Sequence, residues 1–185
     1  MNVGRAVRWR LAVCRFGEYG CIMEISEIVR YGNPVLRKRA DEIKEFDDEI
    51  RALIQRMYVI MAEARGLGLA GPHIGISKRI FTYDIGEGPH ALVNPRVVRT
   101  GGEEIAVEGC LSIPGLQGEV PRAERITVAG LDENGDKVKI KAEGMLARVF
   151  QHELDHLDGT VFVDRADPDT LETVPLEEQG AESRE

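Results

Sequence analysis

The pattern of apolar positions predicts two helices. Asp47 or Asp48 fits the N-cap of the first helix, and Gly66 fits its C-terminal end. The second covers residues 144–157 and ends at Gly159. Apolar residues at positions i, i+3, i+4, i+7 and i+11 form one face of the first helix: Ile50, Leu53, Ile54, Met57 and Met61.

Four other segments have the composition or alternation of β-strands. Residues 79–84 and 91–100 are separated by a loop rich in glycine and proline. Residues 125–131 and 137–141 flank an Asn-Gly pair, which is typical of a hairpin turn. Strands outnumber helices and do not alternate with them regularly, so the pattern favours an α+β fold over a doubly wound parallel sheet.

Composition and charge narrow the function classes. The chain has 185 residues, of which 43% are hydrophobic, and this suits a single domain with a real core. No apolar run approaches the roughly 18 residues that span a bilayer. A net charge of −8 argues against direct nucleic-acid binding, and three cysteines exclude a disulfide-rich scaffold. We therefore expect a cytoplasmic protein with neither a membrane nor a nucleic acid as its partner.

The two ends differ in charge from the rest of the chain. Residues 1–22 carry four arginines against one glutamate and lack the apolar stretch of a secretory signal. We interpret them as an upstream extension, with Met23 as the natural start. Residues 165–185 form an acidic tail with few large apolar residues, most of which we expect to be weakly ordered. The predicted catalytic domain is residues 23–164.

The strongest chemical signal is the run His-Glu-Leu-Asp-His at residues 152–156. His152 and His156 are four residues apart in the second predicted helix, so both imidazoles share a face and can reach one ion. Neutral imidazole suits zinc, iron, nickel or cobalt. Glu153 is placed to take a proton from water on that ion. A solvated helix with two chance histidines is the alternative, but the motif favours a metal site.

A third ligand must come from elsewhere in the chain. No histidine follows His156, and the acidic tail is a poor place for a rigid ligand. Cys110 is the better candidate, because one thiolate and two imidazoles leave the fourth tetrahedral position open for catalysis. The alternative is that Cys110 is simply a small buried residue. The glycine-rich stretch 66–75 lacks the Lys and Ser/Thr of a phosphate-binding loop and fits a structural turn equally well.

Three segments together resemble the peptide deformylase family. They are Gly-x-Gly-Leu-Ala at 66–70, Glu-Gly-Cys-Leu-Ser at 108–112 and Gln-His-Glu-x-Asp-His-Leu at 151–157. The resemblance runs from about Met23 to Asp164. It implies a hydrolase that removes the formyl group from the N-terminal methionine of new polypeptides, and a central metal-binding helix wrapped by antiparallel strands.

The resemblance also implies partners and residue roles. The expected metal is Fe²⁺, with Zn²⁺, Ni²⁺ or Co²⁺ as substitutes, and the expected partners are N-formylmethionyl nascent peptides and, transiently, the ribosome. Gln151 and Asp155 are expected to hydrogen-bond the ligating imidazoles, although Asp155 could be a plain surface carboxylate and Arg148 a solvated side chain. The implied roles are metal ligation by Cys110, His152 and His156, acid/base catalysis by Glu153, oxyanion stabilisation by the Leu111 N–H and the glycine loop, and substrate lining by Leu67, Gly68, Glu108 and Arg148.

One departure from the family pattern matters for activity. The family loop ends in Ala-Ala-x-Gln, whereas this chain has Ala70-Gly71-Pro72-His73. His73 could replace the Gln as the oxyanion donor, pack without a catalytic role, or close the metal site as a fourth ligand. This departure keeps one alternative open: a metal-binding paralogue with little turnover that binds formyl-peptides or acts on another formylated substrate. The His-Glu-x-x-His motif itself leaves another, an endopeptidase, which the missing downstream ligand disfavours.

Overall fold

The computed structural model describes residues 27–175 of the chain. The predicted extension at residues 1–22 and the last part of the acidic tail lie outside these residues. Two α-helices are described, α1 (Asp48–Glu63) and α2 (Gly144–Leu157). Short 3-10 helices are η1 (Pro34–Arg37), η2 (Gly71–Ile74), η3 (Phe162–Asp164) and η4 (Pro168–Thr170). The strands are β1 (Gly68–Ala70), β2 (Ile80–Tyr83), β3 (His90–Gly101), β4 (Glu104–Cys110), β5 (Ile113–Arg122), β6 (Arg125–Leu131), β7 (Lys137–Glu143) and β8 (Glu172–Thr173).

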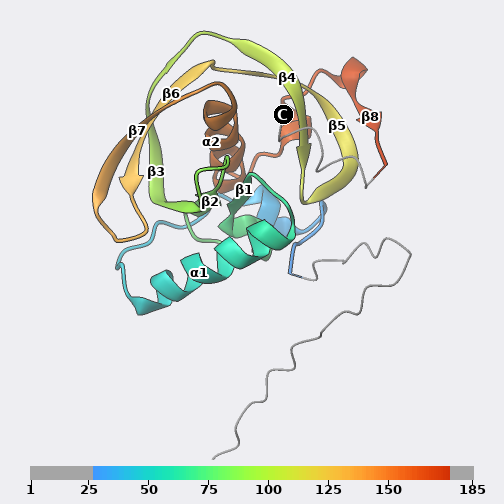
Figure 1. Cartoon of the computed structure of the whole chain (residues 1–185). Helices are drawn as coiled ribbons and strands as arrows, with labels where there is room; N and C mark the ends of the chain where they lie inside the picture. Colours follow the sequence, from blue (N-terminus) through green and yellow to red (C-terminus); the bar gives the residue numbers. More distant parts are fainter. Residues whose placement is uncertain (1–26, 176–185) are drawn as a thin grey trace, which may run out of the picture.

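The strands form two antiparallel sheets around α2. One sheet has the order β1-β2-β3-β6-β7 and the other the order β4-β5-β8. Figure 1 shows α2 enclosed between them, while α1 lies across one end of the molecule. Phe150, Leu154 and Leu157 of α2 pack into a cluster of buried residues with the five-stranded sheet. The predicted α+β fold with a central helix is confirmed.

Helix α1 confirms the first predicted helical face. Asp47 is its N-cap, and the Asp47 carboxylate accepts a hydrogen bond from the Ile50 N–H at 3.0 Å. The end of the helix differs from the prediction, because the left-handed residue is Arg65, with a φ of 54°, and not Gly66. Gly66 instead lies against Leu111, and a Cβ at this position would be 2.9 Å from a Leu111 methyl carbon. This glycine therefore permits close packing against Leu111.

The predicted hairpin of β6 and β7 is confirmed, with Gly135 at a φ of 88° in its turn. The hairpin of β4 and β5 was not predicted. Three glycines interrupt the alternation of apolar and polar residues in this segment, so its sequence pattern predicts a loop; they are Gly109, Gly115 and Gly118. Among residues 27–175, no helix is long and apolar enough to cross a membrane.

The ordered fold continues past the predicted boundary at Asp164. Elements η4 and β8 follow it, and β8 pairs with β5 through Leu116 and Thr173. Ala166 is buried, and Leu171 packs against the same apolar cluster as Phe162. The expectation of weak order is therefore wrong for residues 165–173, because two apolar side chains anchor this acidic segment.

Candidate metal centre

Helix α2 carries two histidines whose ring nitrogens converge. His152 and His156 are one helical turn apart, and their Nε2 atoms lie 3.2 Å from each other. His156 is fully buried, and His152 is partly buried. Two imidazole nitrogens at this separation match one edge of a tetrahedron around a zinc-like ion, which is about 3.3 Å long for bonds of 2.0 Å. The predicted convergence of the two imidazoles is found.

Cys110 approaches these histidines from the other sheet. It is the last residue of β4, where the ladder with β5 is irregular, and its Sγ lies 3.3 Å from Nε2 of His156. The thiol is 7% exposed. A sulfur–nitrogen edge of about 3.5 Å is expected when both atoms bind one ion. The donor set of one sulfur and two nitrogens therefore fits a divalent transition metal.

His73 is the fourth residue of the same cluster. Its Nε2 is 3.5 Å from Sγ of Cys110, and one ligand atom from each of the four residues lies within 4.8 Å of the others. Its Nδ1 accepts a hydrogen bond from the Ala70 N–H at 3.0 Å. Burial lowers the pKa of His73 to about 3, which favours the neutral ring. An Nδ1 that accepts a hydrogen bond leaves the ring proton of the neutral imidazole on Nε2, the atom that lies near Sγ of Cys110.

Glu153 is held beside the cluster, with Oε2 3.6 Å from Nδ1 of His73. Its side chain is nearly fully buried, and Oε2 has no hydrogen-bond partner among residues 27–175. Burial raises the pKa of Glu153 to about 7, against the lowering influence of His152 and of the Ala70 N–H. A carboxylate with a pKa near the working pH can both accept and donate a proton. Its position therefore suits acid/base chemistry.

Gly68, at the start of β1, is the residue that makes room for this carboxylate. A Cβ on Gly68 would lie 2.4 Å from Oε1 of Glu153, closer than real Cβ contacts allow. Leu67 precedes it and packs against the cluster around α2. Leu111 follows Cys110 and packs partly buried on the other side of Gly66. The predicted substrate strand and the predicted oxyanion N–H thus lie on two segments that meet beside Glu153.

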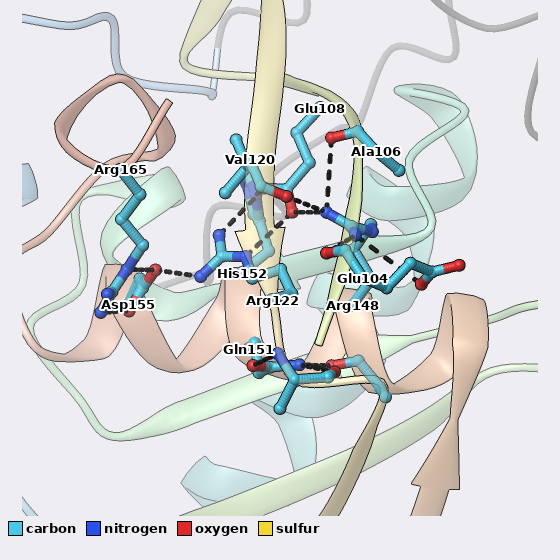
Figure 2. Close-up of polar contacts among 12 residues, drawn as sticks. Glu104, Ala106, Glu108, Val120, Arg122, Arg148, Gln151, His152, Asp155 and Arg165 are labelled. Carbon is cyan, nitrogen blue, oxygen red and sulfur yellow. Dashed lines mark hydrogen bonds and ion pairs between the residues drawn. The ribbon is translucent and has the colours of Figure 1, made fainter. Parts of the chain in front are cut away.

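The back of His152 is bound by the carboxylate of Glu108, a residue for which the family resemblance implied a substrate-lining role. Nδ1 of His152 lies 3.0 Å from Oε2 of Glu108, which places Glu108 behind the imidazole (Figure 2). Arg122 binds both Glu108 oxygens at 2.9 Å, and Arg148 binds Oε1 at 2.8 Å. Burial alone would raise the pKa of Glu108, but the hydrogen bonds from Arg122 and His152 hold it well below its usual range. Glu108 is therefore an ionised partner of His152.

Three expectations about neighbouring side chains are wrong. Gln151 does not bind an imidazole but holds the backbone of Ala123, through hydrogen bonds of 2.9 and 2.8 Å. Asp155 is neither a histidine partner nor a plain surface carboxylate, because it is buried against Arg122 and Arg165 (Figure 2). Arg148 is not solvated, since its side chain is 7% exposed.

Arg122 had no predicted role. It lies within the Pro-Arg-Ala-Glu segment at residues 121–124, and its side chain is 4% exposed. A buried arginine must have anionic partners, but these come from residues 14 and 33 positions away. The sequence offers no local signal for such pairs.

Comparisons with known proteins agree with the geometry. The polypeptide deformylase family model matches residues 25–172. A peptide deformylase from Carboxydothermus hydrogenoformans is 48% identical over 145 residues, covering 78% of this chain and 95% of the relative. One from Thermomicrobium roseum is 45% identical over 167 residues, covering 85% and 95%. The crystal structure of peptide deformylase from Thermotoga maritima superimposes with a TM-score of 0.74 at 44% identity, covering 76% of this chain and 97% of that one. The chain belongs to the polypeptide deformylase family.

Proposed function

We propose that this chain is a working metal-dependent deformylase that removes the N-formyl group from the N-terminal formylmethionine of nascent polypeptides and releases formate. Cys110, His152 and His156 hold the ion. The observation that carries the proposal is the convergence of these atoms beside the buried carboxylate of Glu153. Nε2 of His156 lies 3.2 Å from Nε2 of His152 and 3.3 Å from Sγ of Cys110.

The donor set and the family together favour a particular metal. We propose Fe²⁺ as the native ion, with Zn²⁺, Ni²⁺ and Co²⁺ as substitutes, because imidazole and thiolate ligands suit all four. When bound, such an ion polarises the formyl oxygen and lowers the pKa of coordinated water. Transient contact with the ribosome and a cytoplasmic location stay predictions from the resemblance and the composition.

Glu153 moves the proton in this proposal. Its carboxylate accepts a proton from the attacking water as the water oxygen bonds to the formyl carbon. The same proton then passes to the amine nitrogen as the carbon–nitrogen bond breaks, so the products are formate and a free N-terminus. A pKa of about 7, raised by burial, suits both steps. The Leu111 N–H and His73 stabilise the negative charge that develops on the formyl oxygen.

His73 acts as a donor and not as a fourth ligand. Metal binding through Nε2 requires a lone pair on that atom, so the neutral ring would have to carry its proton on Nδ1. The Ala70 N–H points at Nδ1 from 3.0 Å, and a protonated Nδ1 would place two donors against each other. The ring therefore presents Nε2–H to the cluster, so Cys110, His152 and His156 would be the residues that hold the ion and His73 would not be a ligand.

The peptide lies along the strand that contains Leu67 and Gly68. Gly68 permits the close backbone approach that Glu153 and a substrate amide both need. The substrate-lining role expected of Glu108 and Arg148 stays a prediction. Glu108 binds His152 and Arg122, and Arg148 binds backbone carbonyls. These contacts favour a role for both residues in supporting His152 from behind.

The direct test is formate release from formyl-Met-Ala-Ser. The protein is loaded anaerobically with Fe²⁺ or Ni²⁺, and Glu153→Ala is the control. We expect turnover of at least about 1 s⁻¹, at the low end of ordinary enzymes, and its loss in the control. One tightly bound metal per chain without turnover would overturn the proposal in favour of a paralogue that only binds metal and formyl-peptides.

A further inference from the structure

We propose that Arg165 is a positioning residue for the metal centre, acting on His152 through Asp155, Arg122 and Glu108. The inference rests on the proposed metal site. It gives a role to residues 165–173, which belong to the described fold and contribute no ligand to the metal cluster. Figure 2 shows the side chains in sequence from Arg165 to His152.

The path has no gap between charged groups. Arg165 binds both oxygens of Asp155, at 2.5 Å from Nε and 2.6 Å from Nη2. Asp155 also accepts from Nη1 of Arg122. The other edge of the same guanidinium, Nε and Nη2, holds the two oxygens of Glu108 at 2.9 Å. Glu108 then contacts Nδ1 of His152 at 3.0 Å.

One rigid group in the middle makes the two ends dependent on each other. The planar guanidinium of Arg122 is held by a carboxylate on each side, so it cannot turn toward one without moving from the other. Arg165 supplies the second cation that Asp155 needs. Without Arg165, Arg122 alone must neutralise both Asp155 and its share of Glu108 in a buried setting. Its bidentate grip on Glu108, and thereby the orientation of His152, should loosen.

The backbone around Arg165 is anchored independently of this ion pair. Phe162 and Ala166 are buried, the Ala166 N–H donates to Phe162, and the Asp167 N–H donates to the Glu119 carbonyl at 2.9 Å. The Arg165 side chain itself is 48% exposed. Substitution of Arg165 should therefore leave the segment folded and remove only the charge contact.

Arg37 offers a matched control. It forms an exposed ion pair with Asp164, the residue before Arg165, and its side chain is 41% exposed. Arg37→Met thus loosens the same segment without touching the path to His152. A merely structural tether would respond alike to Arg37→Met and Arg165→Met.

The experiment measures metal binding without substrate. Affinity for Zn²⁺ is determined by chelator competition, and the Co²⁺-loaded protein is examined by visible absorption, for Arg165→Met, Arg165→Lys and Arg37→Met. A direct partner of a ligand typically contributes 10- to 100-fold to affinity. We expect a loss of about 3- to 10-fold in Arg165→Met, with altered cobalt bands, because it acts at greater distance. Arg165→Lys should restore part of the affinity, and Arg37→Met should match the wild type.

A double-variant cycle completes the test. In an Asp155→Asn background the path is already cut, so Arg165→Met should cause no further loss of affinity. An equal loss in both backgrounds, or an equal loss in Arg37→Met, would overturn the proposal. A wild-type protein that binds Zn²⁺ tightly but releases no formate would contradict the proposed function alone. These two failures are therefore distinguishable.

Discussion

The two sides of the metal cluster are built in opposite ways. Behind His152 lies a charged wall, which we define as Glu108, Arg122, Arg148 and Asp155. Its members are buried and bind one another, and Glu108 binds His152. Across the cluster lie Gly68, His73 and Glu153, which we call the open side because a polar atom there is left without a partner in the described part of the chain, although His73 and Glu153 are buried. There Oε2 of Glu153 has no hydrogen-bond partner among the described residues.

The two sides therefore have different roles: the charged wall supports a metal ligand, and the other side holds the groups proposed to take part in the reaction. Ion pairs in the charged wall fix a ligand and leave little capacity for anything else. A buried carboxylate oxygen without a partner costs free energy in the resting protein, and it is available for a proton in the reaction. Ion pairs therefore support His152 from behind, whereas the Glu153 oxygen proposed to take part in proton transfer has no hydrogen-bond partner among residues 27–175. Each prediction below breaks or sharpens this contrast.

The largest effect is expected from Glu153→Gln on the open side. The amide has nearly the same shape but cannot accept and return a proton, so kcat should fall by about 10²- to 10⁴-fold. Formate release under saturating substrate measures this, and metal content by elemental analysis serves as the control. A variant that keeps more than a tenth of the wild-type turnover would show that another group moves the proton.

His73→Phe should cost somewhat less. The ring volume is retained, but the Nε2–H donor is lost, and removal of one oxyanion donor typically lowers kcat by about 10²- to 10³-fold. The comparison of kcat with KM is informative here, because a donor that acts on the developing charge should change kcat and leave KM nearly constant. If KM alone changed, His73 would be a packing residue.

The open side should also reveal itself in the pH dependence of the metal-free protein. Burial raises the pKa of Glu153 from its ordinary 4.5 to about 7, so between these values the folded chain binds a proton that the unfolded chain releases. The contribution of Glu153 to the free energy of unfolding should therefore fall as pH rises through this window, by at most about 3 kcal/mol. The lowered pKa values of His73 and His156 act in the opposite direction. Glu153→Gln removes the contribution of Glu153 alone.

Thermal unfolding of the metal-free proteins checks the sign. The variant and the wild type should be nearly equal at pH 4.5, and the variant should be the more stable at pH 8. A variant that is less stable than the wild type at pH 8 would contradict the idea that ionised Glu153 is held at a cost.

A substitution in the charged wall should change metal affinity, whereas those on the open side change turnover. Glu108→Gln keeps a hydrogen-bond acceptor for His152 but removes the anion that Arg122 and Arg148 share. Metal affinity should fall by about 10- to 100-fold. Glu104→Gln is the matched control, because Glu104 is half-exposed and its carboxylate lies 3.7 Å from Arg148. Chelator competition distinguishes the two, and equal effects would argue against the wall as a support.

The same contrast explains how far the sequence could be interpreted. Spacing within one helix is local information. The four-residue spacing therefore predicts that His152 and His156 converge, with Glu153 beside them, and the structure brings the two imidazoles together. The helix α1 and the hairpin of β6 and β7 were predictable for the same reason. Cys110 needed a second argument, from the ligand count of a catalytic site.

Ion pairs between residues far apart in the sequence could not be predicted. Arg165 and Arg122 meet at Asp155, and Arg122 meets Glu108, only after β4 and β5 have paired and packed against α2. Local composition even pointed the wrong way, because the acidity of the C-terminal segment suggested weak order. Its few apolar residues, Ala166 and Leu171, outweigh the charges once β5 provides a surface for them.

The smallest effect, and the sharpest test of the open side, is expected from His73→Gln. A glutamine amide at this position can donate to the same oxygen, and it matches the family loop, so turnover should stay within tenfold of the wild type or rise. The two amide hydrogens also remove the dependence on one ring tautomer, which in this chain is set by the Ala70 N–H. Formate release at saturating substrate measures the result, with the Co²⁺ spectrum as a check on the ligand set. Because His73 is proposed as a donor, its replacement should leave the cobalt bands nearly unchanged; a large spectral shift together with a turnover loss above tenfold would mean that His73 binds the ion and that the open side is closed.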